Sequence, residues 1–147
     1  MKTLLSASVC LLSLNAFACP QLTGTWNCTT AQNNRSTLTI SQKNVPHGVS
    51  YTVTDDSAKT LVFIADGASH SLNNGEVTGS MTATCPNANS IVGVESFADA
   101  KMGMAGRIDF SFNMSSARTL VSDMKSNLTM TGQPAQVANE KVACILE

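Results

Sequence analysis

A serine and a histidine that follow one another, Ser69 and His70, are the residues best suited to nucleophilic catalysis. A serine nucleophile needs a base within hydrogen-bonding distance. Consecutive residues of a strand, however, point to opposite faces of a sheet. Ser69 and His70 therefore do not form a catalytic pair merely because they are adjacent in sequence. Residues 67–71 also lack the G-x-S-x-G pattern of a nucleophile elbow, which belongs at a strand-to-helix turn. We therefore expect a protein that is not an enzyme and has no catalytic residue.

Residue types that bind metals are present, but their spacing does not form a known site. The two histidines lie beside turn residues, and Asp55, Asp56 and Asp66 are not part of a D-x-D-x-D-G calcium loop. Met102 and Met104 form a Met-x-Met pair of the kind that can bind Cu(I), a soft ion that suits thioether ligands. The other methionines of the domain follow the core-facing phase of adaptable apolar residues. We expect no metal ion and no other cofactor.

The N-terminal residues 1–18 have the three parts of a secretory signal peptide. A lysine is followed by an apolar stretch over residues 4–14 and by an A-x-A cleavage site that ends at Ala18. The apolar stretch is too short to span a bilayer, and no later segment approaches the length of a transmembrane helix. We expect cleavage between Ala18 and Cys19, export to the periplasm or the medium, and one mature domain over residues 19–147.

Four cysteines remain after cleavage, and an even number in an exported chain indicates two disulfides. The alternative for Cys19 is a lipid anchor, because it would be the first mature residue, but the residues before it depart from the lipobox pattern. Four cysteines allow three pairings. Cys28 and Cys144 lie within the first and last expected strands, so we favour Cys28–Cys144 together with Cys19–Cys85.

The charge of the chain argues against two classes of partner. Charged residues make up 13% of the sequence, and without residues 1–18 the chain has eight basic and ten acidic residues. The basic residues form no stripe, so nucleic acid and anionic membrane surfaces are not expected partners. Abundant Ser, Thr and Asn would instead provide the polar outer faces of the strands.

Apolar and polar residues alternate along most of the chain, and turn residues interrupt the alternation every eight to twelve positions. This pattern predicts roughly ten β-strands and no amphipathic helix. The expected strands cover approximately residues 22–29, 37–41, 49–54, 60–65, 69–72, 77–85, 90–97, 108–114, 120–130 and 139–146.

Two connections carry specific predictions. Asp66-Gly67 predicts a hairpin turn between strands 60–65 and 69–72, because glycine tolerates the positive φ that such turns need. Residues 98–106 are the least strand-like stretch, which predicts a loop or a single helical turn.

A succession of strands without long connections predicts an antiparallel meander. With an even number of strands, the last lies antiparallel to the first, so the sheet can close and lose its edges. We therefore predict an all-β, up-and-down β-barrel of about 8–10 strands, with a β-sandwich as the alternative. The face expected to point inward mixes aromatic and small residues: Trp26, Tyr51, Phe63, Phe110, Phe112, Gly24, Gly79, Ala83 and Gly93. Such a barrel can hold a small apolar ligand or be filled by its own side chains, and both remain open.

The first expected strand, residues 22–26 (LTGTW), resembles the first strand of the avidin and lipocalin families, the calycin barrels. Residues 36–40 are similar to the second strand of avidins. The resemblance implies that Gly24 and Trp26 place the indole against the closed end of a barrel. Cys28 stands where avidins have a ligand-contacting asparagine, and Trp26 is the only tryptophan, so the resemblance does not imply biotin binding.

Two hypotheses about function follow. The first is an exported, non-enzymatic binding protein that holds a small hydrophobic molecule in the barrel or binds a partner through its loops. The second is an envelope structural protein, or one similar to a protease inhibitor, that acts through a protein–protein contact. In the second case residues 98–106, or a sheet face rich in threonine, would form the recognition surface.

Overall fold

The computed structural model describes residues 19–73 and 77–147, which fold into an all-β domain. The expected signal peptide, residues 1–18 with the cleavage site at Ala18, lies outside the described residues. Within the described ranges the chain forms no helix, and therefore none that could cross a membrane. The strands are β1 (Gly24–Thr30), β2 (Arg35–Val45), β3 (Gly48–Asp55), β4 (Thr60–Ala65), β5 (Ser69–Asn73), β6 (Val77–Asn87), β7 (Ser90–Asp99), β8 (Met104–Ser116), β9 (Thr119–Met130) and β10 (Gln136–Leu146).

The strands form one sheet that closes into a barrel, as the alternating pattern predicted. Their order is β4-β3-β2-β1-β10-β9-β8-β7-β6-β5, with a further pairing between β4 and β6. The first and last strands are antiparallel neighbours, with Cys28 opposite Cys144. Within the described residues, every strand pairs with the next along the chain except β4 with β5, so the antiparallel meander is interrupted once.

The barrel closes through β4 and β6 rather than through β5, which lies outside the ring of nine strands. This closure is parallel and short: Ala65 pairs with Ala83, whose carbonyl also accepts a hydrogen bond from Gly67 N (2.8 Å). The hairpin predicted at Asp66-Gly67 is wrong, because β4 and β5 do not pair. Instead Asp66 Oδ1 accepts a hydrogen bond from Ala68 N (2.8 Å), which turns the chain through a corner so that β5 pairs with β6.

The stretch at residues 98–106 is also more regular than predicted. β7 continues to Asp99 and β8 begins at Met104, so only residues 100–103 form a turn. The glycine at position 106 is explained by close packing. A Cβ on Gly106 would lie 2.6 Å from both Leu128 Cδ2 and Phe97 Cζ, so the missing side chain leaves room for these two.

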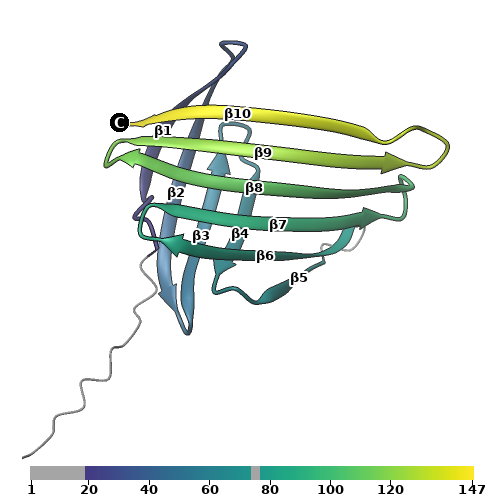
Figure 1. Ribbon diagram of the computed structural model, residues 1–147, viewed down its shortest axis with the longest axis horizontal. Helices are drawn as coiled ribbons and strands as arrows, with labels where there is room; N and C mark the ends of the chain where they lie inside the picture. The colour runs from purple at the N-terminus through teal and green to yellow at the C-terminus, as the bar shows by residue number, and fades with distance from the viewer. Residues whose placement is uncertain (1–18, 74–76) are drawn as a thin grey trace, which may run out of the picture.

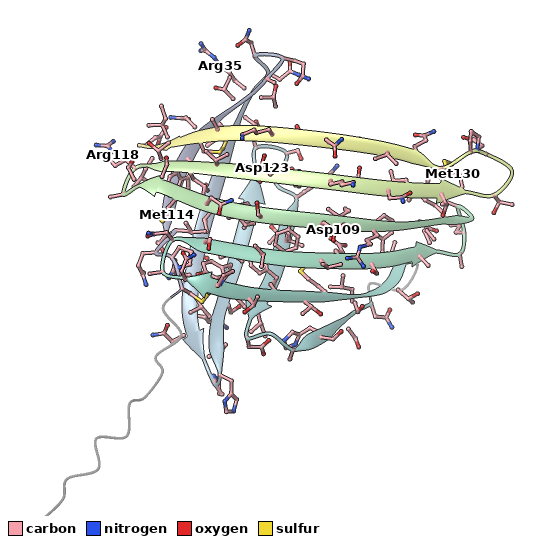
Figure 2. The ribbon with its side chains drawn as sticks, in the orientation of Figure 1. Arg35, Asp109, Met114, Arg118, Asp123 and Met130 are labelled. Carbon is pink, nitrogen blue, oxygen red and sulfur yellow. A yellow bond between two sulfur atoms is a disulfide. The ribbon has the colours of Figure 1, made fainter. Side chains whose placement is uncertain are left out.

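Two layers cross in the barrel (Figure 1). Strands β6–β10, which are 10 to 13 residues long, run across strands β1–β4, which are 6 to 11 residues long, and extend past them on one side. We call the part of β6–β10 beyond β1–β4 the overhang. Asp109 and Met130, both labelled in Figure 2, mark this part of the sheet. The inward-facing residues Glu95, Phe97, Ile108 and Leu128 lie between them in the cross-strand register and are only half-buried.

Where the two layers face each other, side chains fill the interior. Phe63 lies at the centre of an aromatic cluster, with ring centroids 5.2 Å from Tyr51, 5.7 Å from Phe110 and 6.2 Å from Phe112. Phe110 lies directly over Gly93, where a Cβ would come within 2.2 Å of its ring. The small and large residues of the inward face are therefore complementary, as close-packed interiors require.

Candidate functional site

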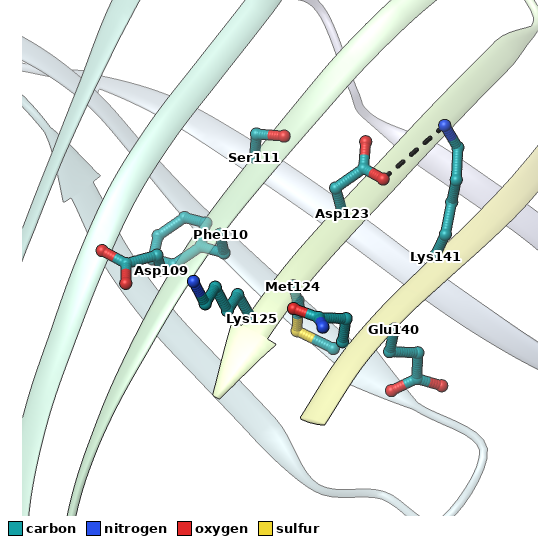
Figure 3. A pocket seen from close by; sticks show the side chains of 9 residues that line it. Asp109, Phe110, Ser111, Asp123, Met124, Lys125, Glu140 and Lys141 are labelled. Carbon is teal, nitrogen blue, oxygen red and sulfur yellow. Dashed lines mark ion pairs between the residues drawn. The ribbon is translucent and has the colours of Figure 1, made fainter. Parts of the chain in front are cut away.

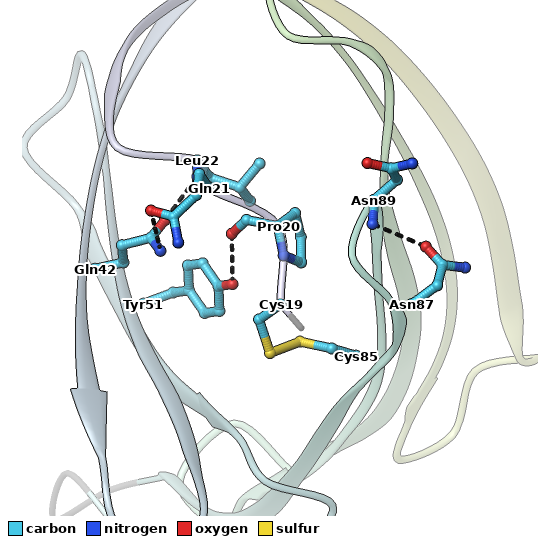
Figure 4. Close-up of a disulfide and its surroundings, with 9 residues drawn as sticks. All are labelled: Cys19, Pro20, Gln21, Leu22, Gln42, Tyr51, Cys85, Asn87 and Asn89. Atoms are coloured by element: carbon cyan, nitrogen blue, oxygen red, sulfur yellow. Dashed lines mark hydrogen bonds between the residues drawn. A yellow bond between two sulfur atoms is a disulfide. The ribbon is translucent and has the colours of Figure 1, made fainter. Parts of the chain in front are cut away.

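The segment Cys19–Leu22, which we call the plug, closes one end of the barrel (Figure 4). Cys19 forms a disulfide with Cys85 of β6, so the sulfur that a lipid anchor would need is already bonded. The hydroxyl of Tyr51 donates a hydrogen bond to the Pro20 carbonyl (2.8 Å). Burial raises the pKa of Tyr51 to about 12, so the hydroxyl stays protonated and able to donate at neutral pH.

Trp26 packs beneath the plug and is only 1% exposed. Its indole Nε1 donates to the Leu22 carbonyl (2.8 Å), and Leu22 N donates to Gln42 Oε1 (2.6 Å). Gly24 has a φ of +146°, and a Cβ there would meet the side chain of Leu146. Gly24 and Trp26 therefore have structural roles beside the plug.

The second disulfide joins Cys28 to Cys144, so the two pairs are those that the strand order favoured. Cys28 lies on β1 and Cys144 on β10, and both are buried. Two disulfides are compatible with a periplasmic or extracellular location, where the oxidising environment preserves them.

A pocket of about 430 Å³ opens at the other end of the barrel, and we call it the mouth pocket. The plug contacts Gln42 and Tyr51, whereas the pocket lies at the opposite ends of the same two strands, β2 and β3. Six strands contribute to its wall. The lining residues are Ser36, Leu38, Val53, Asp55, Asp56, Leu61, Phe112, Ser122, Met124, Glu140 and Val142.

Two apolar side chains of the mouth pocket face inward and yet remain exposed. Leu61 pairs with Val53 on the inner face of β4 and is 38% exposed; Met124 pairs with Phe110 on β9 and is 37% exposed. The inward phase of a strand normally buries its apolar residues. These two are accessible because no strand of residues 19–73 or 77–147 covers this end of the barrel.

Carboxylates form the polar part of the mouth pocket. Asp55 Oδ1 accepts hydrogen bonds from Ser57 Oγ (2.7 Å), Ser57 N (2.9 Å) and Lys59 N (2.9 Å), which lower the pKa of Asp55 and fix the turn after β3. Asp56 Oδ2 accepts a weaker hydrogen bond from Thr37 N (3.4 Å). Glu140, on β10, is exposed at the rim.

Glu95 is a further inward-facing carboxylate, in the overhang. It lies between Met81 and Ile108 in the cross-strand register and forms no hydrogen bond or ion pair within the described residues. Burial raises the pKa of Glu95, because desolvation penalises the charged form. His70 lies two strands away on the same face, where it is bound to Asp66.

We expect Glu95→Gln to be more stable than the wild-type protein at pH 7 by less than about 1 kcal/mol, because solvent at this half-exposed site screens the charge. A raised pKa means that the folded state binds the proton more tightly than the unfolded state does, so ionisation of Glu95 lowers stability as the pH rises. The advantage of the variant should therefore shrink below about pH 4, where the unfolded glutamate is also protonated. Urea denaturation of both proteins across pH 3.5–7.5 measures this difference.

Asp109→Asn is the matched control for this prediction. Hydrogen bonds from Arg107 lower the pKa of Asp109, so ionisation of Asp109 stabilises the folded state, whereas ionisation of Glu95 destabilises it. Neutralising Asp109 should therefore not increase stability at neutral pH. An advantage of Glu95→Gln that is constant over the whole pH range would contradict the explanation by ionisation.

The residues first considered for catalysis do not form a catalytic group. His70 Nε2 lies 3.0 Å from both carboxylate oxygens of Asp66, and this hydrogen bond lowers the pKa of Asp66. Ser69 pairs with Thr82 on the outer face, whereas His70 faces inward opposite Met81. No hydroxyl or thiol is hydrogen-bonded to His70 in the part of the chain that the structure describes.

The possible metal ligands are also dispersed. Met102 is 57% exposed in the turn after β7, and Met104 is half-buried on β8. Among residues 19–73 and 77–147, no three His, Cys, Asp or Glu side chains are grouped so that they could hold a metal ion.

A second depression, of about 390 Å³, lies against β8, β9 and β10 (Figure 3). Its lining includes Asp123 and Lys141, which form an ion pair at 3.7 Å, beside Met124 and Glu140. Met124 and Glu140 also line the mouth pocket, so the two spaces share a wall.

Sequence reasoning placed Met124 in the core and did not identify the mouth pocket. One signal was available: Asp55 and Glu140 occupy the same phase as the apolar residues Val53 and Val142 of their strands. A carboxylate in the inward phase near a strand end indicates an opening, because a charged group is rarely buried without a partner.

Comparison with known proteins gives no assignment. No protein-family model matches this chain, and no match to a curated protein sequence is found. The resemblance of residues 22–26 to calycin barrels stays a prediction.

Proposed function

We propose that this protein is an exported, non-enzymatic binding protein that holds a small apolar molecule in its mouth pocket. The observation that carries the proposal is the exposure of two inward-facing apolar side chains, Leu61 and Met124, at an end of the barrel that no described strand covers. Phe112 lies at the inner wall of the same pocket and is buried. Concave, mostly apolar sites with a few polar groups are the usual form of small-molecule sites.

The volume of the pocket supports a ligand of modest size. About 430 Å³ lies toward the lower end of the range of small-molecule sites. Transfer of one methylene group from water to an apolar site contributes about 0.8 kcal/mol. Among ligands that fit, two additional carbon atoms should therefore tighten binding about tenfold.

We expect Leu61→Asp to weaken binding of the neutral fluorescent probe N-phenyl-1-naphthylamine at least about tenfold. The substitution replaces an apolar contact with a charge that needs water, which opposes burial of an apolar ligand. The increase in probe fluorescence on titration with the mature protein measures the affinity.

Val62→Asp is the matched control, since Val62 is the next residue of β4, faces outward and is 54% exposed. It introduces the same charge on the same strand and should leave binding of the probe unchanged. Equal losses in the two variants, or no binding by the wild-type protein, would contradict the proposed function.

A protein–protein contact is the second candidate, and the edge of β4 favours it. In the described part of the chain, residues 60–64 pair with β3 on one side alone, so their other backbone groups are available to an extended segment of a partner. Native mass spectrometry of the protein isolated from its source separates the candidates, since a bound small molecule favours the first and a stoichiometric protein partner the second.

A further inference from the structure

Acidic and basic residues of the strands are distributed differently between the two faces of the sheet. The cross-strand pairings place Asp55 opposite Leu38, Glu95 opposite Ile108 and Glu140 opposite Met124, so these carboxylates face inward with the apolar lining. Every lysine and arginine within the described strands faces outward. These are Arg35, Lys43, Arg107, Lys125 and Lys141.

Acidic residues of the outer face, by contrast, have cationic partners. Asp109 forms an ion pair with Arg107 (2.8 Å), and Asp123 lies 3.7 Å from Lys141. Asp109 and Asp123, both labelled in Figure 2, lie on the neighbouring strands β8 and β9. Among the described strands, the outer face therefore has five lysine or arginine residues and two acidic ones, whereas Asp55, Glu95 and Glu140 face inward with no lysine or arginine on the same face.

Asp55, Asp56 and Glu140 line the mouth pocket, and its lining contains no lysine, arginine or histidine. Lys59, in the turn after β3, contributes to the lowered pKa of Asp55, so Asp55 is partly balanced by the protein itself. Asp56 and Glu140 form no ion pair within the described residues, and both are exposed. The pocket thus combines an accessible apolar wall with two exposed carboxylates at its rim that form no ion pair within the described residues.

We propose that the ligand of the mouth pocket is a cationic amphiphile, with its apolar body against Leu61, Phe112 and Met124 and its ammonium or guanidinium group at Asp56 and Glu140. This inference rests on the proposed function and specifies the chemical class of the ligand. The carboxylates at the rim attract a cationic group, and they repel an anionic ligand of the same shape.

Three ligands with the same ten-carbon chain test the charge preference: decylamine, 1-decanol and decanoate. Each is added below its micelle concentration, at pH 7 and low salt, to displace N-phenyl-1-naphthylamine from the mature protein. We expect decylamine to bind at least about tenfold more tightly than decanoate, with decanol between them. Raising the ionic strength from about 0.01 M to 0.5 M should reduce the difference, because salt screens exposed charges.

Matched double variants separate a local effect from a change in net charge. Asp56→Asn with Glu140→Gln removes two charges at the rim, and Asp109→Asn with Asp123→Asn removes two from the outer face. The first variant should lose most of the preference for decylamine while binding decanol unchanged, and the second should retain it. Asp55 is left intact, because its carboxylate holds the turn after β3.

The outcomes distinguish the inference from the proposal on which it rests. Binding of all three ligands with equal affinity, or equal losses of preference in the two double variants, overturns the inference and leaves the proposed function in place. Failure of the wild-type protein to bind the probe and every ligand overturns both.

Discussion

Replacing Cys28 and Cys144 together by alanine is expected to lower the free energy of unfolding by about 4–5 kcal/mol. The disulfide joins the first and last strands of the barrel, 116 residues apart, so it removes a large part of the conformational freedom of the unfolded chain. A domain of this size is stable by only about 5–15 kcal/mol, so the variant should be close to unfolding at 37 °C. Denaturation by urea under non-reducing conditions measures the loss.

The other disulfide provides the comparison. Cys19 and Cys85 are 66 residues apart, and because the entropy of loop closure depends on the logarithm of length, removing this bridge should lower stability by nearly the same amount. A loss below about 1 kcal/mol for the Cys28/Cys144 variant would contradict the entropic explanation. A much larger loss for Cys19 and Cys85 would show that the plug also stabilises the barrel by packing.

The sequence was sufficient to predict the neighbours of β1, β10 and the disulfide between them. Strict alternation over long strands identifies each inward face, and short connections force consecutive strands to pair. The expected return of the last strand beside the first favoured the Cys28–Cys144 pair, and the two cysteines do lie opposite each other. The closed ring itself has nine strands, and its last strand is still antiparallel to the first because the closure between β4 and β6 is parallel.

Closure of the barrel was not predictable in the same way. It depends on a single pair, Ala65 with Ala83, and on a corner held by the Asp66 carboxylate. The dipeptide Asp66-Gly67 favours a hairpin in isolation, but a short strand such as β5 has too few residues to decide its own pairing. Long-range geometry, and not local propensity, selected β6 as the partner of both strands.

The mouth pocket was missed for a related reason. Alternation predicts that Leu61 and Met124 face inward, and both do. Whether an inward face is buried depends on how far the opposite layer extends, and β4 has only 6 residues against 12 in β9. That mismatch between layers arises because the strands of the two layers cross in three dimensions. The alternation of apolar and polar residues along one strand does not report how the layers cross.

Phe63→Ala is expected to lower the free energy of unfolding by about 3–5 kcal/mol. Phe63 is 4% exposed and contacts the rings of Tyr51, Phe110 and Phe112, so its removal leaves a cavity at the centre of the aromatic cluster. It also holds β4 in place, because this strand has a complete partner on one side only. Urea denaturation followed by circular dichroism measures the loss.

Two further variants show whether the loss arises from packing. Val62→Ala, at the neighbouring outward position, should change stability by less than about 0.5 kcal/mol. Phe63→Leu, which keeps most of the volume, should lose less than half as much as Phe63→Ala. If Phe63→Ala and Val62→Ala had similar small effects, the cluster would not anchor β4. The mouth pocket, whose wall includes Leu61 of the same strand, would then lack the rigid support that a preformed binding site needs.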